Sequence, residues 1–207
     1  MKIKIISAYN EPFKEISDLS FSTVDNFCQN KSITCERFYV REFDKPMAWF
    51  KIKVLIDEIK LNQYDYILWI DADAMILDKN FDIESIIDHS KILHIAKDFN
   101  NINSGVMIWK VCELSSYLLD QIWLMSEKYL HHMWWEQAAI IELYEKNIGN
   151  ILENTSFVKQ STLNAYETRY YGPLREEGEI NEKSFICHFP ALPVNTRINL
   201  IKKYIKL

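Results

Sequence analysis

An uncharged five-residue run that ends in two aspartates constrains the fold of this chain more than any other feature. The run, Tyr66–Ile70, has the apolar character of a strand that is covered on both faces of a sheet. It stops at Asp71, and Asp73 follows two residues later. In open α/β sheets, ligands bind beyond the carboxyl ends of the strands. We therefore expect both carboxylates to lie at the ligand-binding edge of a buried sheet.

Strand-like and helix-like stretches alternate along the chain, which predicts an α/β fold with a mostly parallel, Rossmann-like central sheet. Short apolar or alternating runs indicate strands, and apolar residues at helical spacing indicate helices. The expected strands span residues 2–7, 33–40, 66–70, 92–96, 106–109 and 184–189. The expected helices span residues 13–27, 47–61, 114–129, 134–146 and 195–205. Without repeats or linker-like tracts, residues 1–207 are expected to form a single domain.

The composition restricts the partners that we expect. A chain of 207 residues with 48% hydrophobic residues can bury a substantial core. The net charge of −5 argues against a general nucleic-acid binder. The four cysteines match neither a zinc site nor a disulfide framework, so we expect reduced, mostly buried thiols. No window resembles a transmembrane helix or a signal peptide, and the expected location is the cytoplasm. Nothing in the sequence indicates the oligomeric state.

The aspartate pair predicts a metal site. Two carboxylates beside an apolar strand are costly to bury unless a positive charge lies between Asp71 and Asp73. Hard oxygen ligands suit Mg²⁺ or Mn²⁺, and such ions commonly bridge to substrate phosphates. A bare Asp-x-Asp sequence can also cap an ordinary turn. The apolar strand before it favours the metal site.

Two other enzyme classes place related motifs after a strand. Phosphatases of the haloacid dehalogenase type carry Asp-x-Asp after the first strand and a threonine or valine two residues later. Here the pair lies about a third of the way along the chain, and Met75 occupies that later position. Sugar nucleotidyltransferases carry a glycine-rich loop after the first strand, whereas residues 8–12 contain no glycine. Both classes lose support.

Several short motifs occur in an order that resembles one transferase family. They are Trp49-Phe50-Lys51-Ile52, Trp69-Ile70-Asp71-Ala72-Asp73-Ala74, Asn103-Ser104-Gly105-Val106, Glu136-Gln137-Ala138-Ala139 and His188-Phe189. The chain thereby resembles the galactosyltransferase/mannosyltransferase family, which includes yeast α-galactosyl- and α-mannosyltransferases and plant xyloglucan xylosyltransferases. The resemblance extends over residues 49–189.

The resemblance implies a GT-A nucleotide-diphospho-sugar transferase fold and transfer with retention of anomeric configuration. It implies that Asp71, Asp73 and His188 surround a metal ion. An imidazole beside two carboxylates tilts such a site from Mg²⁺ toward Mn²⁺. The implied partners are a nucleotide-sugar donor, with UDP favoured over GDP, and a glycan acceptor. Alone, His188 would be interpreted as a core or interface histidine.

The resemblance also implies residues that contact the donor sugar. Asn103, Ser104 and Gly105 resemble an Asn-Thr-Gly turn that leads into a strand under this sugar. A glycine here allows the backbone to approach a ligand closely. Asp98 resembles an aspartate that hydrogen-bonds sugar hydroxyls. The alternative interpretations are an ordinary turn and a surface carboxylate.

Three further residues are candidates for contact with the nucleotide. Lys51 lies in the family-like helix and approaches the nucleotide if the resemblance holds, although a solvated helix position is the alternative. Tyr9 ends the first expected strand and is positioned to stack on a nucleobase or simply to pack. Relatives often carry a lysine a few residues after the late histidine, where it meets the diphosphate. This chain has none there, and Arg197 is the candidate substitute.

Glu136 and Gln137 resemble the acidic residue and glutamine that lie near the reacting carbon in this family. Glu136 would stabilise an oxocarbenium-like centre or act as a nucleophile, and Gln137 would steady the developing charge. Without the resemblance, both would be interpreted as a solvated helix start. Trp134 and Trp135 beside them are candidates for stacking on acceptor sugars or for core packing.

Tyr166, Arg169, Tyr170 and Tyr171 form a polar-aromatic group, and Gly172-Pro173 predicts a loop there. Such a loop is a candidate lid or acceptor contact, or an ordinary surface loop. Two other functions remain open for the whole chain: a non-catalytic nucleotide-sugar or carbohydrate-binding protein on the same fold, and a metal-dependent sugar phosphatase. Retention of both carboxylates and a third candidate ligand favours an enzyme.

Overall fold

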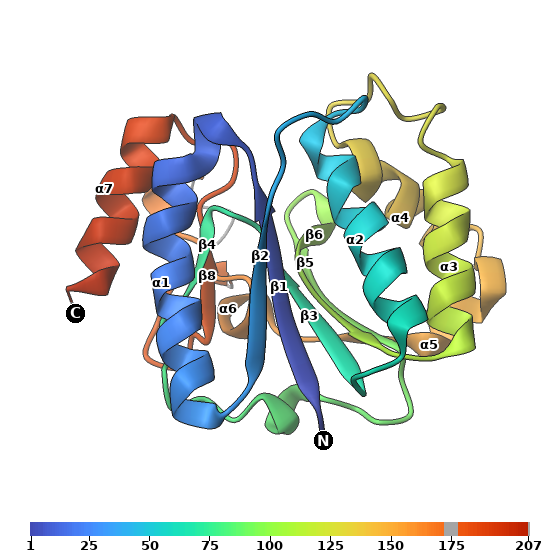
Figure 1. Ribbon diagram of the computed structural model, residues 1–207, viewed down its shortest axis with the longest axis horizontal. Coiled ribbons are helices and arrows are strands. Elements are labelled where there is room, and N and C mark those ends of the chain that lie inside the picture. The colour runs from blue at the N-terminus through green and yellow to red at the C-terminus, as the bar shows by residue number, and fades with distance from the viewer. Residues whose placement is uncertain (172–177, 207) are drawn as a thin grey trace.

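The computed structural model describes residues 1–171 and 178–206 and contains a six-stranded central sheet (Figure 1). The strand order is β2-β1-β3-β6-β5-β7. β6 is antiparallel to its neighbours β3 and β5, and the other neighbouring pairs are parallel. The sheet is therefore mostly parallel, as predicted. The strands are β1 (Ile3–Tyr9), β2 (Thr34–Tyr39), β3 (Tyr66–Ile70), β5 (Leu93–Asp98), β6 (Asn101–Lys110) and β7 (Thr155–Phe157).

Helices cover both faces of the sheet (Figure 1). On one face lies α1 (Lys14–Lys31), and the C-terminal helix α7 (Val194–Ile205) packs outside it. On the other face lie α2 (Met47–Leu61), α3 (Glu113–Leu124) and α4 (Trp135–Glu145). The short helices are α5 (Ile151–Asn154) and α6 (Gln160–Leu163).

β3 explains why the sheet is buried on both faces. Successive side chains of a strand point to opposite faces, so Ile67 and Trp69 pack into the core under α2, α3 and α4. Tyr66, Leu68 and Ile70 pack into the core on the side of α1. Full burial of one such side chain contributes about 1.5–3 kcal/mol. This packing fixes the end of β3, and with it the position of the residues that follow.

A small second sheet brings the end of the chain to the end of β3. β4 (Ala74–Ile76) pairs antiparallel with β8 (Ile186–His188), and Ala74 lies opposite His188. The ladder is short, but all of its residues are buried. His188 is therefore held beside Asp73, 115 residues away in the sequence.

Two sequence expectations about these elements are wrong, and two short strands have no sequence expectation. The expected strand 106–109 begins already at Asn101, so residues 103–105 lie within β6 and not in a turn before it. The sequence hides this because Asn, Ser and Gly are poor strand formers. The expected helix 114–129 ends at Leu124 and continues as hydrogen-bonded turns. β4 and β7, each three residues long, were not predicted at all.

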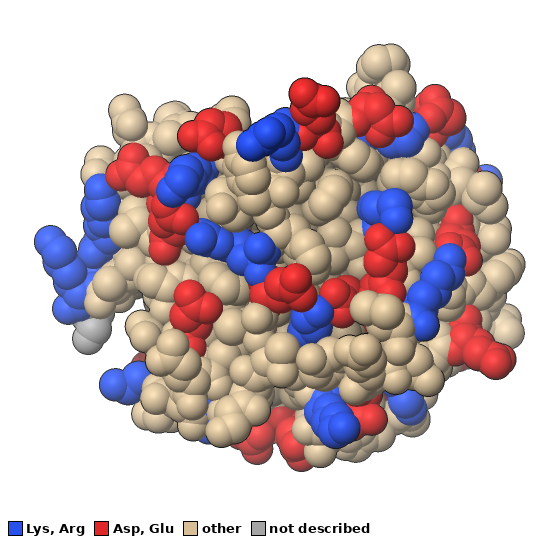
Figure 2. Space-filling view, viewed as in Figure 1, with Lys and Arg blue, Asp and Glu red and all other residues tan. Residues whose placement is uncertain are grey.

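The described surface and thiols add two observations. Basic and acidic side chains are interspersed over the face in Figure 2, apart from a basic group at its left edge, where α7 carries Lys202 and Lys203 in its last turn.

The four cysteines form no disulfide bonds. Cys28 and Cys187 are buried, and Cys35 and Cys112 are partly exposed. Within residues 1–171 and 178–206, none of the helices has both the length and the apolar character needed to cross a membrane.

Candidate metal and donor-binding site

Segments distant in sequence meet where β3 ends. A tight turn links β3 to β4, in which the Ala74 N–H donates to the Asp71 carbonyl at 2.9 Å. The Asp71 N–H donates to the Gly105 carbonyl in β6, also at 2.9 Å. The ladder between β4 and β8 then adds His188. Four elements thus contribute to the edge at which the sequence predicts a ligand site.

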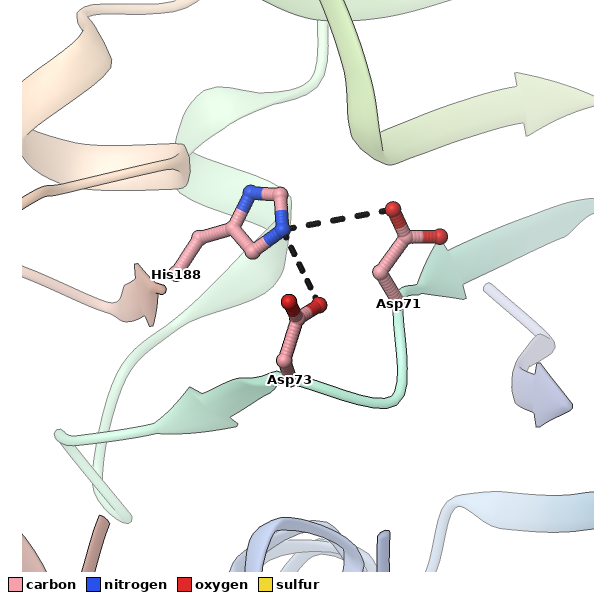
Figure 3. A group of neighbouring side chains, drawn as sticks. All are labelled: Asp71, Asp73 and His188. Atoms are coloured by element: carbon pink, nitrogen blue, oxygen red, sulfur yellow. Dashed lines mark hydrogen bonds and ion pairs between the residues drawn. The ribbon is translucent and has the colours of Figure 1, made fainter. Parts of the chain in front are cut away.

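Asp71, Asp73 and His188 point toward one another (Figure 3). His188 Nε2 lies 3.2 Å from Oδ1 of Asp73 and 4.0 Å from Oδ2 of Asp71. One ligand atom from each residue lies within 4.8 Å of the others. Asp73 and His188 are buried and Asp71 is partly exposed, so the site is open on the Asp71 side. Two carboxylate oxygens and an imidazole nitrogen suit Mn²⁺ or Mg²⁺, and the three residues can hold such an ion.

Asp73 is held between His188 and Arg197. Arg197, in the first turn of α7, has Nη1 3.2 Å from Oδ2 of Asp73, while Oδ1 faces His188. Burial pushes the pKa of the Asp73 carboxyl upward, but His188 and Arg197 outweigh burial and lower that pKa to about 2. Asp73 is therefore kept ionised. We call Asp71, Asp73, His188 and Arg197 the metal-side cluster.

Lys51 lies at the centre of a second buried cluster. Its Nζ is 2.9 Å from Oδ1 of Asp71 and 2.9 Å from Oε1 of Glu136, and it donates to the Ser104 carbonyl at 2.9 Å. Lys51 and Glu136 are each 3% exposed, so the interpretation of either as a solvated helix residue is wrong. Burial favours the neutral amine, but Asp71 and Glu136 raise the pKa of Lys51 above its usual range. We call Lys51, Ser104 and Glu136 the lysine-side cluster; Asp71 links the two clusters.

Glu136 and Gln137 lie in the first turn of α4 and meet Ser104 of β6. The Ser104 hydroxyl donates to Oε1 of Glu136 at 2.8 Å. The Ser104 backbone N–H donates to Oε1 of Gln137 at 3.2 Å. Burial raises the pKa of Glu136, Lys51 opposes the rise, and Asp71 adds to it. The carboxylate is thus positioned by two donors, Lys51 and the Ser104 hydroxyl, on its lysine-facing side.

Asp98 is not an ordinary surface carboxylate. At the end of β5, its Oδ2 accepts hydrogen bonds from Asn103 Nδ2 and the Tyr166 hydroxyl, both at 2.8 Å. Its Oδ1 accepts the backbone N–H of Asn100 at 2.6 Å. Burial raises the pKa of Tyr166 well above its usual value, with Asp98 contributing, so Tyr166 stays a hydroxyl donor. Three groups therefore fix Asp98 rigidly beside β6.

Gly105 leaves room for the imidazole of His188. A Cβ at position 105 would lie 2.2 Å from His188 Cε1 and 2.6 Å from Nδ1, closer than packed atoms approach. The backbone N–H of Gly105 donates to Oδ1 of Asn103 at 2.8 Å. The glycine is thus required for the close approach of a metal-ligand candidate, and its ordinary turn interpretation is wrong.

The remaining candidates lie around this centre. Tyr9 ends β1 on the same sheet edge, with its ring 5.3 Å from that of Tyr39 and 4.5 Å from the Arg37 guanidinium. Trp135 is 39% exposed and has a positive φ of 37°, so core packing does not describe it. Trp134 is partly exposed and contacts His132. The expected loop at Gly172-Pro173 lies outside the described residues, whereas Arg169 and Tyr170 are exposed.

Sequence reasoning missed two residues of the centre. Trp69 Nε1 donates to Oδ1 of Asp71 at 2.7 Å, although the sequence suggested only a buried strand residue. Asn164 has Oδ1 2.9 Å from Nδ1 of His188. No local pattern marks Asn164, because its partner is 24 residues away and the intervening chain has no regular spacing. The one related signal in the sequence was the expected strand that contains its partner, His188.

Sequence comparison identifies one family. The profile of the galactosyl transferase GMA12/MNN10 family matches residues 88–192, which is just over half of the chain. The matched span contains Glu136 and His188, and the two aspartates of the metal-side cluster precede it. No curated protein matches the chain in sequence.

Several solved structures share the fold. A glycosyltransferase involved in glycosylation of the major capsid of PBCV-1 superposes with a TM-score of 0.77 at 16% identity, over 98% of this chain and 100% of that one. GlyE of Streptococcus pneumoniae TIGR4 gives 0.60 at 12% identity, over 100% of this chain and 61% of GlyE. An active-site mutant of LgtC gives 0.58 at 12% identity, over 97% and 95% of the two chains. Together with the topology, these likenesses show the GT-A fold.

Proposed function

The chain belongs to the galactosyl transferase GMA12/MNN10 family, and from this premise we propose that residues 1–207 form one GT-A domain with metal-dependent glycosyltransferase activity. The proposed reaction transfers a hexosyl or pentosyl group from a nucleotide-sugar to a glycan hydroxyl, with retention of configuration. The observation that carries the proposal is the convergence of Asp71, Asp73 and His188 at the end of β3. The fold and family support the same reaction class.

The metal-side cluster is proposed to bind the donor's diphosphate. The chemistry that Mn²⁺ or Mg²⁺ supplies in such a site is neutralisation of the charge that builds on the leaving nucleoside diphosphate. Asp73, ionised and flanked by His188, presents one oxygen to this site. Arg197 lies on the other side of Asp73, and its guanidinium would pair with a phosphate oxygen.

The lysine-side cluster is proposed to stabilise the reacting sugar. Lys51 and Ser104 both contact Oε1 of Glu136, so this oxygen is shared between two donors. A carboxylate whose Oε1 accepts two hydrogen bonds is a weak nucleophile. Its other oxygen, Oε2, would face the oxocarbenium-like centre. We therefore favour attack of the acceptor hydroxyl from the face of the leaving group. Gln137 would donate from its amide N–H₂ group to oxygens of the sugar, because within the described residues only its Oε1 has a hydrogen-bond partner.

Donor and acceptor are proposed to lie on opposite sides of Glu136. Asp98 and Asn103 would bind hydroxyls of the donor sugar, and Tyr9 would pack against the base, for which UDP is favoured. The exposed Trp135 is the candidate contact for acceptor rings. The galactosyltransferase LgtC, which shares the fold, has been crystallised with donor and acceptor sugar analogs.

Nucleotide release tests the proposal. A panel of UDP- and GDP-sugars is incubated with the protein and mixed glycan acceptors, in Mn²⁺ and in EDTA. We expect release with one donor in Mn²⁺ only, reduced by about 10³-fold or more in Asp73→Asn, because a bound metal contributes several kcal/mol to such steps. Asp57→Asn is the matched control, since Asp57 is exposed and pairs only with Lys53 among the described interactions.

The other outcomes identify the rival functions. Saturable donor binding without release in any acceptor mixture would favour a nucleotide-sugar-binding protein. Release of inorganic phosphate from sugar phosphates, with no requirement for a nucleotide, would favour a phosphatase. Equal release by wild type and Asp73→Asn would contradict the role of the metal-side cluster.

A further inference from the structure

Asn164 is a fully buried polar residue that the proposed reaction does not use directly. It follows α6 and immediately precedes a segment that runs parallel to β8. Its Oδ1 lies 2.9 Å from Nδ1 of His188. In the described part of the chain its Nδ2 has no hydrogen-bond partner, although the atom is buried. The side chain therefore makes its one described polar contact with His188.

The backbone gives no reason for an asparagine at this position. Asn164 has φ −150° and ψ 53°, outside the left-handed region in which asparagine is favoured. Its backbone N–H donates to the Gln160 carbonyl at 2.8 Å, a contact that any residue except proline makes. A buried amide with an unpaired N–H₂ group costs free energy that an apolar side chain would avoid. The amide oxygen is the part of the residue with a partner.

The hydrogen-bond roles at this contact follow from the chemistry of the amide. An amide oxygen only accepts, so Nδ1 of His188 must carry the proton that it donates to Asn164. The Asp73 carboxylate beside Nε2 also only accepts, so a divalent cation that binds there would take the place of a proton on Nε2, while Nδ1–H stays bonded to Asn164. Nε2 is the atom that lies 3.2 Å from Asp73 and 4.0 Å from Asp71. The contact thus directs the ligating nitrogen into the metal-side cluster.

The neighbouring backbone fixes this contact in register. The Ala165 N–H donates to the Ile186 carbonyl at 2.9 Å, and the His188 N–H donates to the Ala165 carbonyl at 2.8 Å. Asn164 therefore immediately precedes Ala165, whose two backbone hydrogen bonds fix this segment against β8. On the other side, Gly105 packs against Cε1 and Nδ1 of the same ring. The imidazole can neither rotate toward β6 nor move along β8.

We propose that Asn164 is a positioning residue that holds His188 in the Nδ1–H tautomer and presents Nε2 to a divalent cation. This inference rests on the proposed function, because it requires a metal at Asp71, Asp73 and His188. Partners of metal-ligating histidines typically change metal affinity by about 10–100-fold when removed. Asn164 acts through His188 and touches no reacting atom in this account.

Mn²⁺ binding, followed by the electron paramagnetic resonance signal of free Mn²⁺, tests the proposal without turnover. Asn164→Leu keeps the branched shape but removes the acceptor, and it should weaken Mn²⁺ binding by about tenfold or more. Asn164→Asp keeps an acceptor oxygen and should restore most of the affinity. Asn154→Leu is the matched control: it makes the same substitution at an asparagine whose amide contacts the Asn150 carbonyl and not the metal-side cluster. Its Mn²⁺ affinity should equal that of the wild type.

The tautomer provides the second readout. In ¹⁵N-histidine-labelled protein loaded with diamagnetic Mg²⁺, long-range ¹H–¹⁵N spectra should show His188 with its one proton on Nδ1 and that proton hydrogen-bonded. Asn164→Leu should lose the hydrogen-bonded Nδ1–H signal, whereas Asn164→Asp should retain it. If Asn164→Leu does not fold, the wild-type tautomer and the Asn164→Asp affinity decide the question.

The outcomes separate this inference from the function on which it rests. A wild-type protein that binds no Mn²⁺ would overturn both. Wild-type binding that Asn164→Leu leaves unchanged, or a Mg²⁺-loaded wild-type His188 without a hydrogen-bonded proton on Nδ1, would overturn the role of Asn164 and leave the proposed function standing. Equal losses in the folded Leu and Asp variants would also overturn it, because bulk packing would then explain the effect.

Discussion

The two charged clusters that share Asp71 differ in how completely their charges are matched. On the lysine side, the Lys51 ammonium lies between the Asp71 and Glu136 carboxylates and also donates to the Ser104 carbonyl. On the metal side, Asp73 has an arginine at one oxygen, while the second oxygen and Asp71 face an imidazole. The first arrangement already has a cation at its centre, and the second can accept one. The comparison indicates that Lys51 organises the site and that the aspartates receive the ligand.

Substitution of Lys51 should produce the largest change in stability. Lys51→Met leaves Asp71 and Glu136 without their shared cation in a buried setting, and we expect a loss of about 3–5 kcal/mol in the free energy of unfolding. Urea denaturation followed by circular dichroism measures it. Combining Lys51→Met with Glu136→Gln should recover part of the loss, because one unpaired carboxylate is then removed.

Lys53→Met is the matched control on the same helix. Lys53 is 49% exposed at its side chain and pairs with Asp57 one turn away. Exposed pairs of this kind contribute about 0.3–0.5 kcal/mol. If Lys51→Met cost no more than Lys53→Met, Lys51 would not organise the lysine-side cluster as described above.

Acid should destabilise the metal side through Asp73. Its folded-state pKa of about 2 lies below the usual value, so its ionised form contributes stability above the unfolded pKa near 4. This contribution is lost as the pH falls from about 4 toward 2, and it amounts to about 2 kcal/mol. The free energy of unfolding of the metal-free protein is measured by urea titration between pH 6 and pH 2. It should fall less steeply with decreasing pH for Asp73→Asn than for the wild type. Parallel curves for the two proteins would contradict the pairing of Asp73 with Arg197 and His188.

The smallest effect concerns the space beside His188. Gly105→Ala places a methyl group against the imidazole and should weaken Mn²⁺ binding by about tenfold, as displacement of a ligand support does. Gly149→Ala is the comparison: Gly149 has φ 61°, so alanine there costs about 1–2 kcal/mol of stability without touching the metal side. Calorimetric titration with Mn²⁺ distinguishes the two, and equal affinities would show that Gly105 does not support His188.

The sequence predicted those parts of the molecule that local patterns encode. The bounds of β3 and α2 agree with the structure because an uncharged run and a helical apolar stripe are each contiguous signals. The same run marked Asp71 and Asp73 as residues at a strand end. The order of family-like motifs then drew attention to His188 and Glu136, which a local pattern alone would have assigned to packing and solvent.

The contacts that give these residues their chemistry were not predictable from local patterns. Lys51 and Glu136 lie 85 residues apart, and Asn164 has no spacing that relates it to its partner. The β4–β8 ladder consists of three-residue strands, too short for a periodic signal. Residues 103–105 were interpreted as a turn from their resemblance to the family's Asn-Thr-Gly motif. In the structure, pairing with β5 and burial place them in a strand although Asn, Ser and Gly are poor strand formers.

An anomalous difference map from crystals soaked with Mn²⁺ and UDP tests the proposed metal site most directly. We expect one strong peak within about 2.5 Å of Asp71, Asp73 and Nε2 of His188, with UDP phosphate oxygens completing the coordination. A map with no peak at this position, and with Asp73 still paired to Arg197 in the presence of UDP, would contradict it.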